Sequence, residues 1–234
     1  LLFFSGIVLL FGATSCIEDF TIRGNGIEAT EGRITNEFNQ VKSEGNFDVH
    51  ITNGTEFDVV IYAESNLIPH IETNVTGNTL RIYIRGIHNV NNRLPMEVYI
   101  TTPTLRGITQ SGSGIITTDY FIANQFDAVI SGSGKIETAV DAVNVNAIVS
   151  GSGNLLISGE ATGADLLVSG SGKIDAYNLE LRDCEAKISG SGNIWVTVER
   201  FLKASISGSG NLYYYGSPEI EKHISGSGNV VNFN

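Results

Sequence analysis

The chain has 234 residues, with 27 glycines, only 17% charged residues and a formal net charge of −11 at pH 7. This acidic balance argues against a nucleic-acid partner and against a basic membrane-binding face, because both would need clustered positive charge. Abundant glycine and sparse charge agree with an exported protein.

The first sixteen residues are predicted to be a signal peptide. Residues 1–11 are almost wholly apolar and too short to cross a bilayer as a helix, and they lead into Ala13-Thr14-Ser15-Cys16. Small residues before a cysteine resemble the lipobox of bacterial lipoproteins, where a diacylglycerol is attached to the thiol. Cys16 is therefore the predicted lipidation site and membrane anchor. The alternative is an ordinary signal peptide that is cut elsewhere, with an incidental cysteine.

Residues 17–34 are predicted to be a linker, and residues 35–105 an N-terminal β-rich cap. Apolar alternation at 47–51 and 57–61 around Asn53-Gly54 predicts an antiparallel hairpin. A second pair of strands is expected at 80–84 and 96–100. Such a cap would cover the open end of the structure that follows.

Residues 106–234 are organised by a repeated tetrapeptide. The sequence SGSG occurs seven times, at intervals of 18 to 20 residues. Self-similarity at that period is typical of a solenoid in which each turn adds a strand to a parallel sheet. The motifs begin at Ser111, Ser131, Ser150, Ser169, Ser189, Ser207 and Ser225.

Apolar residues alternate with polar ones on both sides of each motif, which puts them on one face of each strand. The sequence therefore predicts an all-β parallel β-helix of about seven short turns, with at least two strands in each turn. Right-handed coiling fits the irregular period better than the strict multiples of six in left-handed helices. The column one residue before the motif contains Ile130, Val149, Val168, Ile188, Ile206 and Ile224; the column three before contains Ala128, Ala147, Leu166, Ala186, Ala204 and Lys222.

The serines of the motif have two possible directions. Unbroken alternation would turn both glycines inward and both serines outward. A bend at the glycines would allow the serines to turn inward and hydrogen-bond between rungs.

No catalytic residue, metal site or cofactor is predicted. The four histidines are scattered without ligand spacing, and the chain has no paired cysteine motif. Glu137 and Asp175 share an outward column two rungs apart, with Leu156 between them, and are interpreted as solvated charges. Cys184 falls on an inward column and is expected to be a buried small hydrophobe.

Exposed aromatic side chains are the candidate contact surface. Trp195 and Tyr213 share one outward column, and Tyr177, Tyr215 and Phe233 share the column two residues later. Stacked aromatics can bind sugar rings or a protein partner, but they can also shield the open C-terminal end. Self-association through this end is a third possibility, which Lys222 in an inward column would discourage.

The SGSG turns, the ending GSPEIEKHISGSGNV and the segments FDVHITNGTEFDVVI and NTLRIYI resemble the head GIN domain family of auto-transporter adhesins. The resemblance covers roughly residues 35–234. It implies a β-helical, exported or lipid-anchored protein of a Bacteroides-type bacterium, and it implies no catalytic residues. The acidic residues after Cys16 also resemble signals that send lipoproteins to the outer face of the outer membrane.

The sequence therefore favours a non-enzymatic, lipid-anchored adhesin of the outer membrane that binds a glycan or a surface protein. A structural or stress-linked envelope scaffold without a specific ligand is the main alternative. A glycan-active β-helix enzyme is the third.

Overall fold

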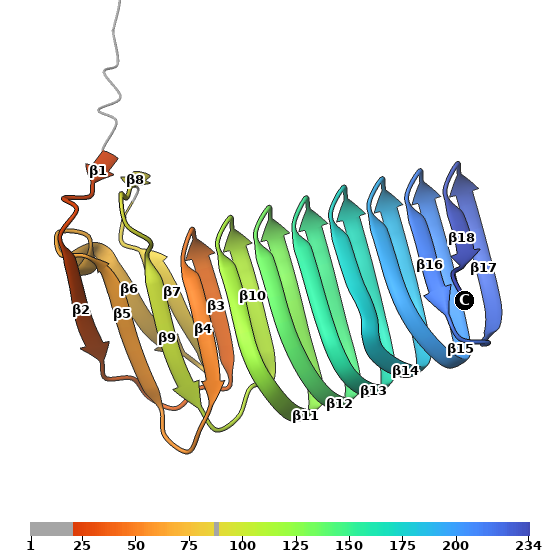
Figure 1. Cartoon of the computed structure of the whole chain (residues 1–234), viewed down its shortest axis with the longest axis horizontal. Coiled ribbons are helices and arrows are strands. Elements are labelled where there is room, and N and C mark those ends of the chain that lie inside the picture. Colours follow the sequence, from red (N-terminus) through yellow and green to blue (C-terminus); the bar gives the residue numbers. More distant parts are fainter. Residues whose placement is uncertain (1–20, 87–88) are drawn as a thin grey trace, which may run out of the picture.

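The computed structural model describes residues 21–86 and 89–234 as strands joined by short turns, with a single short 3₁₀ helix, η1 (Ile68–His70) (Figure 1). The N-terminal strands are β1 (Thr21–Arg23), β2 (Glu28–Arg33), β3 (Gln40–Gly45), β4 (Asp48–Asn53), β5 (Asp58–Glu64), β6 (Ile71–Thr76), β7 (Thr79–Ile84), β8 (Asn89–Asn91) and β9 (Glu97–Thr102). The coils that follow are formed by β10 (Gly107–Gly112), β11 (Ile115–Gly132), β12 (Lys135–Gly151), β13 (Asn154–Gly170), β14 (Lys173–Gly190), β15 (Asn193–Gly208), β16 (Asn211–Tyr215), β17 (Glu219–Gly226) and β18 (Asn229–Asn232).

The repeats form the predicted parallel β-solenoid of about seven turns. Neighbouring coils pair in parallel, and each SGSG motif makes the turn at one edge. From β11 to β15 each coil is one continuous strand of 16 to 18 residues, rather than two separate strands. The ladder continues through the opposite bend between β12 and β13, where Asp141 and Glu160 are partners. The register shifts near this bend in the pairs β11–β12, β13–β14 and β14–β15.

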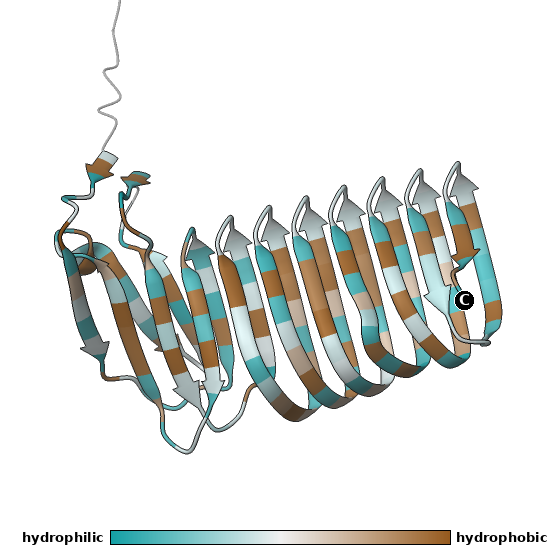
Figure 2. Cartoon of the chain, in the orientation of Figure 1, coloured by the Kyte–Doolittle hydropathy of each residue, from teal (hydrophilic) through white to brown (hydrophobic). Residues whose placement is uncertain are grey.

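The inward columns make one continuous apolar core, and brown and teal alternate along each strand in Figure 2. Phe126, Ala147 and Ile188 are almost fully buried. The last coil differs, because β17 and β18 have a neighbouring coil on one side only. Ile224 is 39% exposed there, and Lys222 is exposed as well.

The SGSG turn combines features of both sequence-based alternatives. Its serines are exposed or partly exposed, and its second glycine is buried against the coil below. The first glycine has a positive φ, +124° at Gly190, a conformation that L side chains rarely adopt. Backbone N–H groups of Ser191 and Gly192 both donate to the carbonyl oxygen of Gly170, at 2.9 and 3.0 Å. The turns therefore stack through their backbones, and the hydroxyls point outward.

The predicted hairpin of residues 47–51 with 57–61 is wrong. β4 pairs in parallel with β9 and β11, whereas β5 pairs antiparallel with β9 and β2. β9 therefore lies between the two strands, and the Asn53-Gly54 segment joins strands that are not neighbours.

The predicted pairing of residues 80–84 with 96–100 is also wrong. β7 pairs antiparallel with β6 and in parallel with β3, while β9 belongs to the sheet of β4 and β5. Antiparallel strands do occur in the N-terminal part, as predicted, but with different partners.

Hydrogen bonding is continuous across the predicted domain boundary between residues 105 and 106. β3 and β4 pair in parallel with β10 and β11, so they add a coil to the same stack. Part of the predicted linker is also in strands, since β2 pairs with β5. The division into domains and the handedness of the coil stay predictions.

A buried carboxylate ties the N-terminal segment to this end of the solenoid. Glu64 is fully buried and accepts hydrogen bonds from the backbone N–H groups of Gly26, Arg93 and Leu94. Burial alone would raise the pKa of Glu64, but the three donors outweigh that effect and lower the pKa. Residues 1–20, with the predicted lipidation site Cys16, lie outside the described residues.

Candidate functional site

The five predicted aromatic residues lie together in one connected cluster near the C-terminal end of the solenoid. Trp195 and Tyr213 stack with ring centroids 5.2 Å apart and an interplanar angle of 12°. Phe233 packs edge-on against both Tyr213 and Tyr215, at 5.7 and 5.4 Å. The ring centroids of Tyr177 and Tyr215 are 4.3 Å apart. We call this set, Tyr177, Trp195, Tyr213, Tyr215 and Phe233, the aromatic cluster.

Strand register produces the central stack of the cluster. Trp195 on β15 and Tyr213 on β16 are direct partners in a parallel pair, and both side chains leave the same face of the sheet. Adjacent strands lie about 4.8 Å apart, so two flat rings in one column meet face to face. This contact follows from the repeat alignment alone.

A difference in coil length brings Tyr177 into the cluster. The coil from Ser169 to Ser189 has 20 residues, whereas the next one has 18. The register between β14 and β15 accordingly jumps between Ala176 and Glu180, and residues 177–179 have no partners on β15. The bulge is held by Thr197, whose hydroxyl donates to the carbonyl oxygen of Tyr177 at 2.6 Å. Tyr177, 46% exposed, thereby reaches past β15 to Tyr215.

A groove of about 320 Å³ adjoins the aromatic cluster on the same face. Asp175 lies at the C-terminal side of the groove. It belongs to β14, the coil before β15, and it is the register partner of Trp195. Glu137 is neutralised by an ion pair with Lys135, whereas the carboxylate of Asp175 accepts one long hydrogen bond, from the N–H of Tyr177 at 3.4 Å. The groove is lined by Thr117, Thr118, Glu137, Thr138, Ala139, Leu156, Ile157, Ser158, Asp175 and Asn178.

The other end of this outward column carries aromatic residues that the sequence analysis missed. His50 stacks on Tyr99 with centroids 4.8 Å apart, and Tyr62 packs edge-on against Tyr99 at 5.2 Å. The Nδ1 of His50 is 2.9 Å from the hydroxyl of Thr117, at the margin of the groove. The incorrect hairpin prediction concealed this group, since only the pairing of β4 with β9 and β11 puts these residues in the column.

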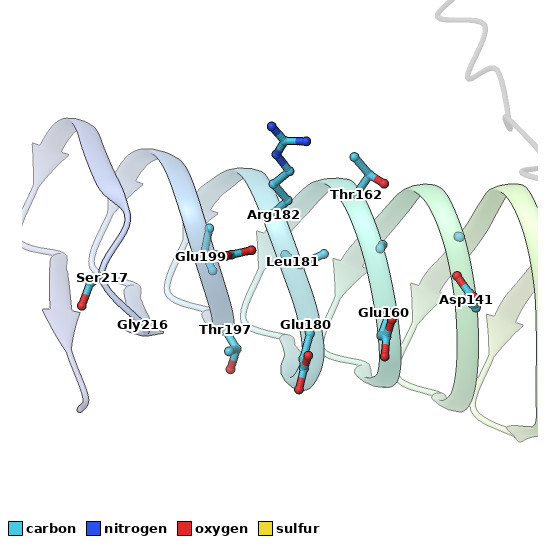
Figure 3. Close-up of a pocket in the computed structure, with 13 residues that line it drawn as sticks. Asp141, Glu160, Thr162, Glu180, Leu181, Arg182, Thr197, Glu199, Gly216 and Ser217 are labelled. Atoms are coloured by element: carbon cyan, nitrogen blue, oxygen red, sulfur yellow. The ribbon is translucent and has the colours of Figure 1, made fainter.

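A larger groove of about 620 Å³ lies along the bend opposite the SGSG edge, and it is acidic (Figure 3). Asp141, Glu160 and Glu180 are register partners on three successive coils. Like charges directly opposite each other in a sheet destabilise it slightly. Among residues 21–86 and 89–234, no group of three or more histidine, cysteine, aspartate or glutamate side chains is arranged to hold a metal ion.

Cys184 is buried in the core, as predicted. Burial, with smaller contributions from the charges of Asp165 and Glu185, raises the pKa of its thiol far above the ordinary value. Burial therefore favours the protonated form of the thiol and shields it from solvent.

A family model described as "putative auto-transporter adhesin, head GIN domain" matches residues 37–218. The chain belongs to this head GIN domain family. The matched range includes both sides of the predicted boundary at residues 105 and 106 and all of the aromatic cluster except Phe233. No curated protein sequence matches the chain significantly.

Several solved structures resemble the chain over most of its length. A "putative adhesin" from Bacteroides fragilis is 28% identical, with a TM-score of 0.84, and the match covers 91% of this chain and all of that one. A "putative lipid binding protein" from Parabacteroides distasonis is 25% identical, with a TM-score of 0.78, covering 92% and 100%. A second "putative adhesin" from that species, at 22% identity and a TM-score of 0.74 over 91% and 100%, shares the fold.

The membership and these neighbours indicate an adhesin-like protein of the cell surface. In the part of the chain that the structure describes, no helix has the length and hydropathy needed to cross a bilayer.

Proposed function

We propose that this head GIN domain protein is a non-enzymatic adhesin that binds a glycan or a surface protein through the aromatic cluster. The observation that carries the proposal is the convergence of five aromatic side chains from β14, β15, β16 and the C-terminal segment into one cluster, in which two rings are exposed and three are partly exposed. Aromatic rings supply large contact areas at low entropic cost, and they are enriched at binding surfaces.

The location of the aromatic cluster suits display away from a membrane. A lipid on Cys16 would hold the protein through the five residues up to Thr21, which span at most about 18 Å. β1 and the C-terminus lie at opposite ends of the solenoid (Figure 1). Eight strand spacings, about 38 Å, separate β2 from β15. An anchor at Cys16 would therefore leave the cluster at the end of the solenoid far from the membrane.

The carboxylates near the aromatic cluster favour binding over hydrolysis. Glycoside hydrolysis needs two carboxyl groups of distinct protonation across one bond. Here Glu137 is paired with Lys135, and two strand spacings, about 10 Å, separate its backbone from that of Asp175. This arrangement supports a non-enzymatic protein.

An array of glycans and matrix proteins tests the proposal directly. The probe is the full chain carrying Cys16→Ser, which removes the predicted lipid site, compared with the same chain carrying Trp195→Ala and Tyr213→Ala. Saturable binding that the double variant loses is expected. Tyr83→Ala, an aromatic truncation on the other face of the solenoid, is the control and should bind normally. A blank array with correctly folded protein would favour the structural scaffold instead.

A further inference from the structure

Trp195 stands at the boundary between the aromatic cluster and the groove. One face of its indole is covered by Tyr213, which follows it in the stack. Because the two rings are nearly parallel, the opposite face of the indole is directed toward the preceding coil. The register partner there is Asp175, which lines the groove. Trp195, which is partly exposed, therefore lies next to the groove at its Asp175 end.

The carboxylate of Asp175 has free hydrogen-bonding capacity beside this ring. An ionised carboxylate offers about four acceptor positions. Asp175 uses one of them, in a 3.4 Å hydrogen bond, and it makes no ion pair with any residue in the described ranges 21–86 and 89–234. A ligand that lies on Trp195 thus meets an acceptor that is available to its hydroxyl groups.

The rest of the groove is lined by polar and apolar side chains, and its other carboxylate, Glu137, forms an ion pair with Lys135. Asn178 contributes an exposed amide, which both donates and accepts hydrogen bonds, whereas the hydroxyl of buried Thr138 is bonded to that of Thr118 at 2.7 Å and the hydroxyl of Ser158 makes a long bond to the Thr138 carbonyl oxygen. Leu156 supplies an apolar patch in the column between Glu137 and Asp175. An ammonium or guanidinium group would use acceptors only, whereas a sugar has hydroxyls that donate and accept, together with C–H faces that pack on rings.

We propose that the groove between Thr117 and Trp195 binds a neutral oligosaccharide, with one sugar ring on the free face of Trp195 and its hydroxyls donating to Asp175. This inference rests on the proposed adhesin function and names its ligand class. The column from Thr117 to Trp195 covers four strand spacings, about 19 Å, which accommodates more than one sugar unit. Acidic sugars are disfavoured by Asp175 and by the net charge of −11.

Binding to soluble polysaccharides tests the inference. The full chain with Cys16→Ser is titrated by calorimetry with dextran, mannan and laminarin, which are neutral, with chondroitin sulfate, which is anionic, and with polylysine. We expect a neutral polysaccharide to bind. Trp195→Ala and Asp175→Asn should each weaken that binding by about tenfold or more, equivalent to 1.4 kcal/mol.

Two control variants isolate the groove. Asp165→Asn removes an exposed carboxylate from the other face, and Tyr83→Ala removes an aromatic ring there; both should bind as the parent does. Thermal unfolding checks each variant for folding. If Trp195→Ala is unfolded, Asp175→Asn and the conservative Trp195→Phe carry the test.

Each remaining outcome separates this inference from the adhesin function. If a neutral polysaccharide binds and neither Trp195→Ala nor Asp175→Asn weakens that binding, the groove is not the binding site, although the adhesin function still holds. Adhesion to cells or proteins without binding to any neutral polysaccharide would refute the neutral oligosaccharide as the ligand, but it would leave the proposed adhesin function intact. Preferential binding of chondroitin sulfate, or polylysine binding lost in Asp175→Asn, would also refute the neutral oligosaccharide. Absence of all adhesion would contradict the proposed function itself.

Discussion

Replacing Gly192 by alanine should destabilise the solenoid strongly, although the change adds only a methyl group. Gly192 is the second glycine of its SGSG motif, and a Cβ built on it would lie 2.3 Å from the carbonyl oxygen of Gly172 and 2.4 Å from a methyl carbon of Val168. Contacts below 3.0 Å require something to move, and here the nearest atom is backbone.

The size of the effect follows from two contributions. Overpacking a well-packed core costs about 1–3 kcal/mol. Moving the Gly172 carbonyl also weakens its 3.2 Å hydrogen bond from the N–H of Asn193, which is worth about 1 kcal/mol. We therefore expect Gly192→Ala to lower the free energy of unfolding by about 2–4 kcal/mol.

Equilibrium urea unfolding, followed by far-ultraviolet circular dichroism, measures this loss. The matched control is Gly32→Ala, because a Cβ at Gly32 meets nothing within 4 Å and its φ is not positive. Alanine there restricts the unfolded chain and should be neutral or stabilising by about 0.4–1 kcal/mol. Equal midpoints for the two variants would refute the idea that the second glycine is required by close stacking of the turns.

Three further results are expected. In the Cys16→Ser chain, Cys184 should resist a thiol reagent until denaturant is added, since its thiol is buried and its pKa is raised; rapid labelling of native protein would contradict this. Lys222→Ala should increase concentration-dependent association in light scattering, because Lys222 occupies the inward column of the last coil and its register partner Ala204 is apolar; an unchanged molar mass would show that the lysine does not protect this end. The pKa of Glu64 is lowered in the fold, so its stabilisation is fully present above the ordinary value of 4.5 and is lost as the pH falls through the folded pKa. Glu64→Gln should therefore cost more stability at pH 7 than at pH 3, and an equal loss at both pH values would argue against the three backbone donors as its cause.

The solenoid could be predicted from the sequence because the residues that determine each turn lie close together in the chain and recur in every turn. Each turn repeats the same alternation around SGSG, so a single alignment fixes which residues face inward. Ala147 and Ile188 are buried for that reason, and the Trp195 and Tyr213 stack follows from the same alignment. The pattern fails at both ends of the stack, because fully buried Gln110 takes the place of an apolar residue before the first motif and the last coil lacks a second neighbour.

The N-terminal pairings could not be predicted in the same way. A turn signal such as Asn53-Gly54 reports that the chain reverses, but it does not report whether a third strand will occupy the space between the two. β9 comes more than thirty residues after β5 and inserts between β4 and β5. That choice depends on the parallel stack, where β4 needs a neighbour opposite β11.

The repeat alignment grouped the five aromatic residues into two columns, but it did not predict how their side chains contact one another. In the repeat alignment, Tyr177 lies two residues beyond the column of Trp195. Its contact with Tyr215, however, depends on the bulge in β14. The 20-residue coil before an 18-residue one was visible in the sequence as drift in the period. Where the additional residues are accommodated is decided by packing at the bend, which the period does not encode.

Trp195 offers the most direct measurement, because it is the only tryptophan of the chain. Its emission spectrum, recorded while a bound polysaccharide or surface protein is titrated, reports on the proposed contact without any substitution. We expect a saturable change in the intensity or wavelength of the Trp195 emission, with the same midpoint as binding measured by calorimetry. Saturable binding with an unchanged Trp195 spectrum would contradict the claim that the aromatic cluster and its groove form the adhesive site.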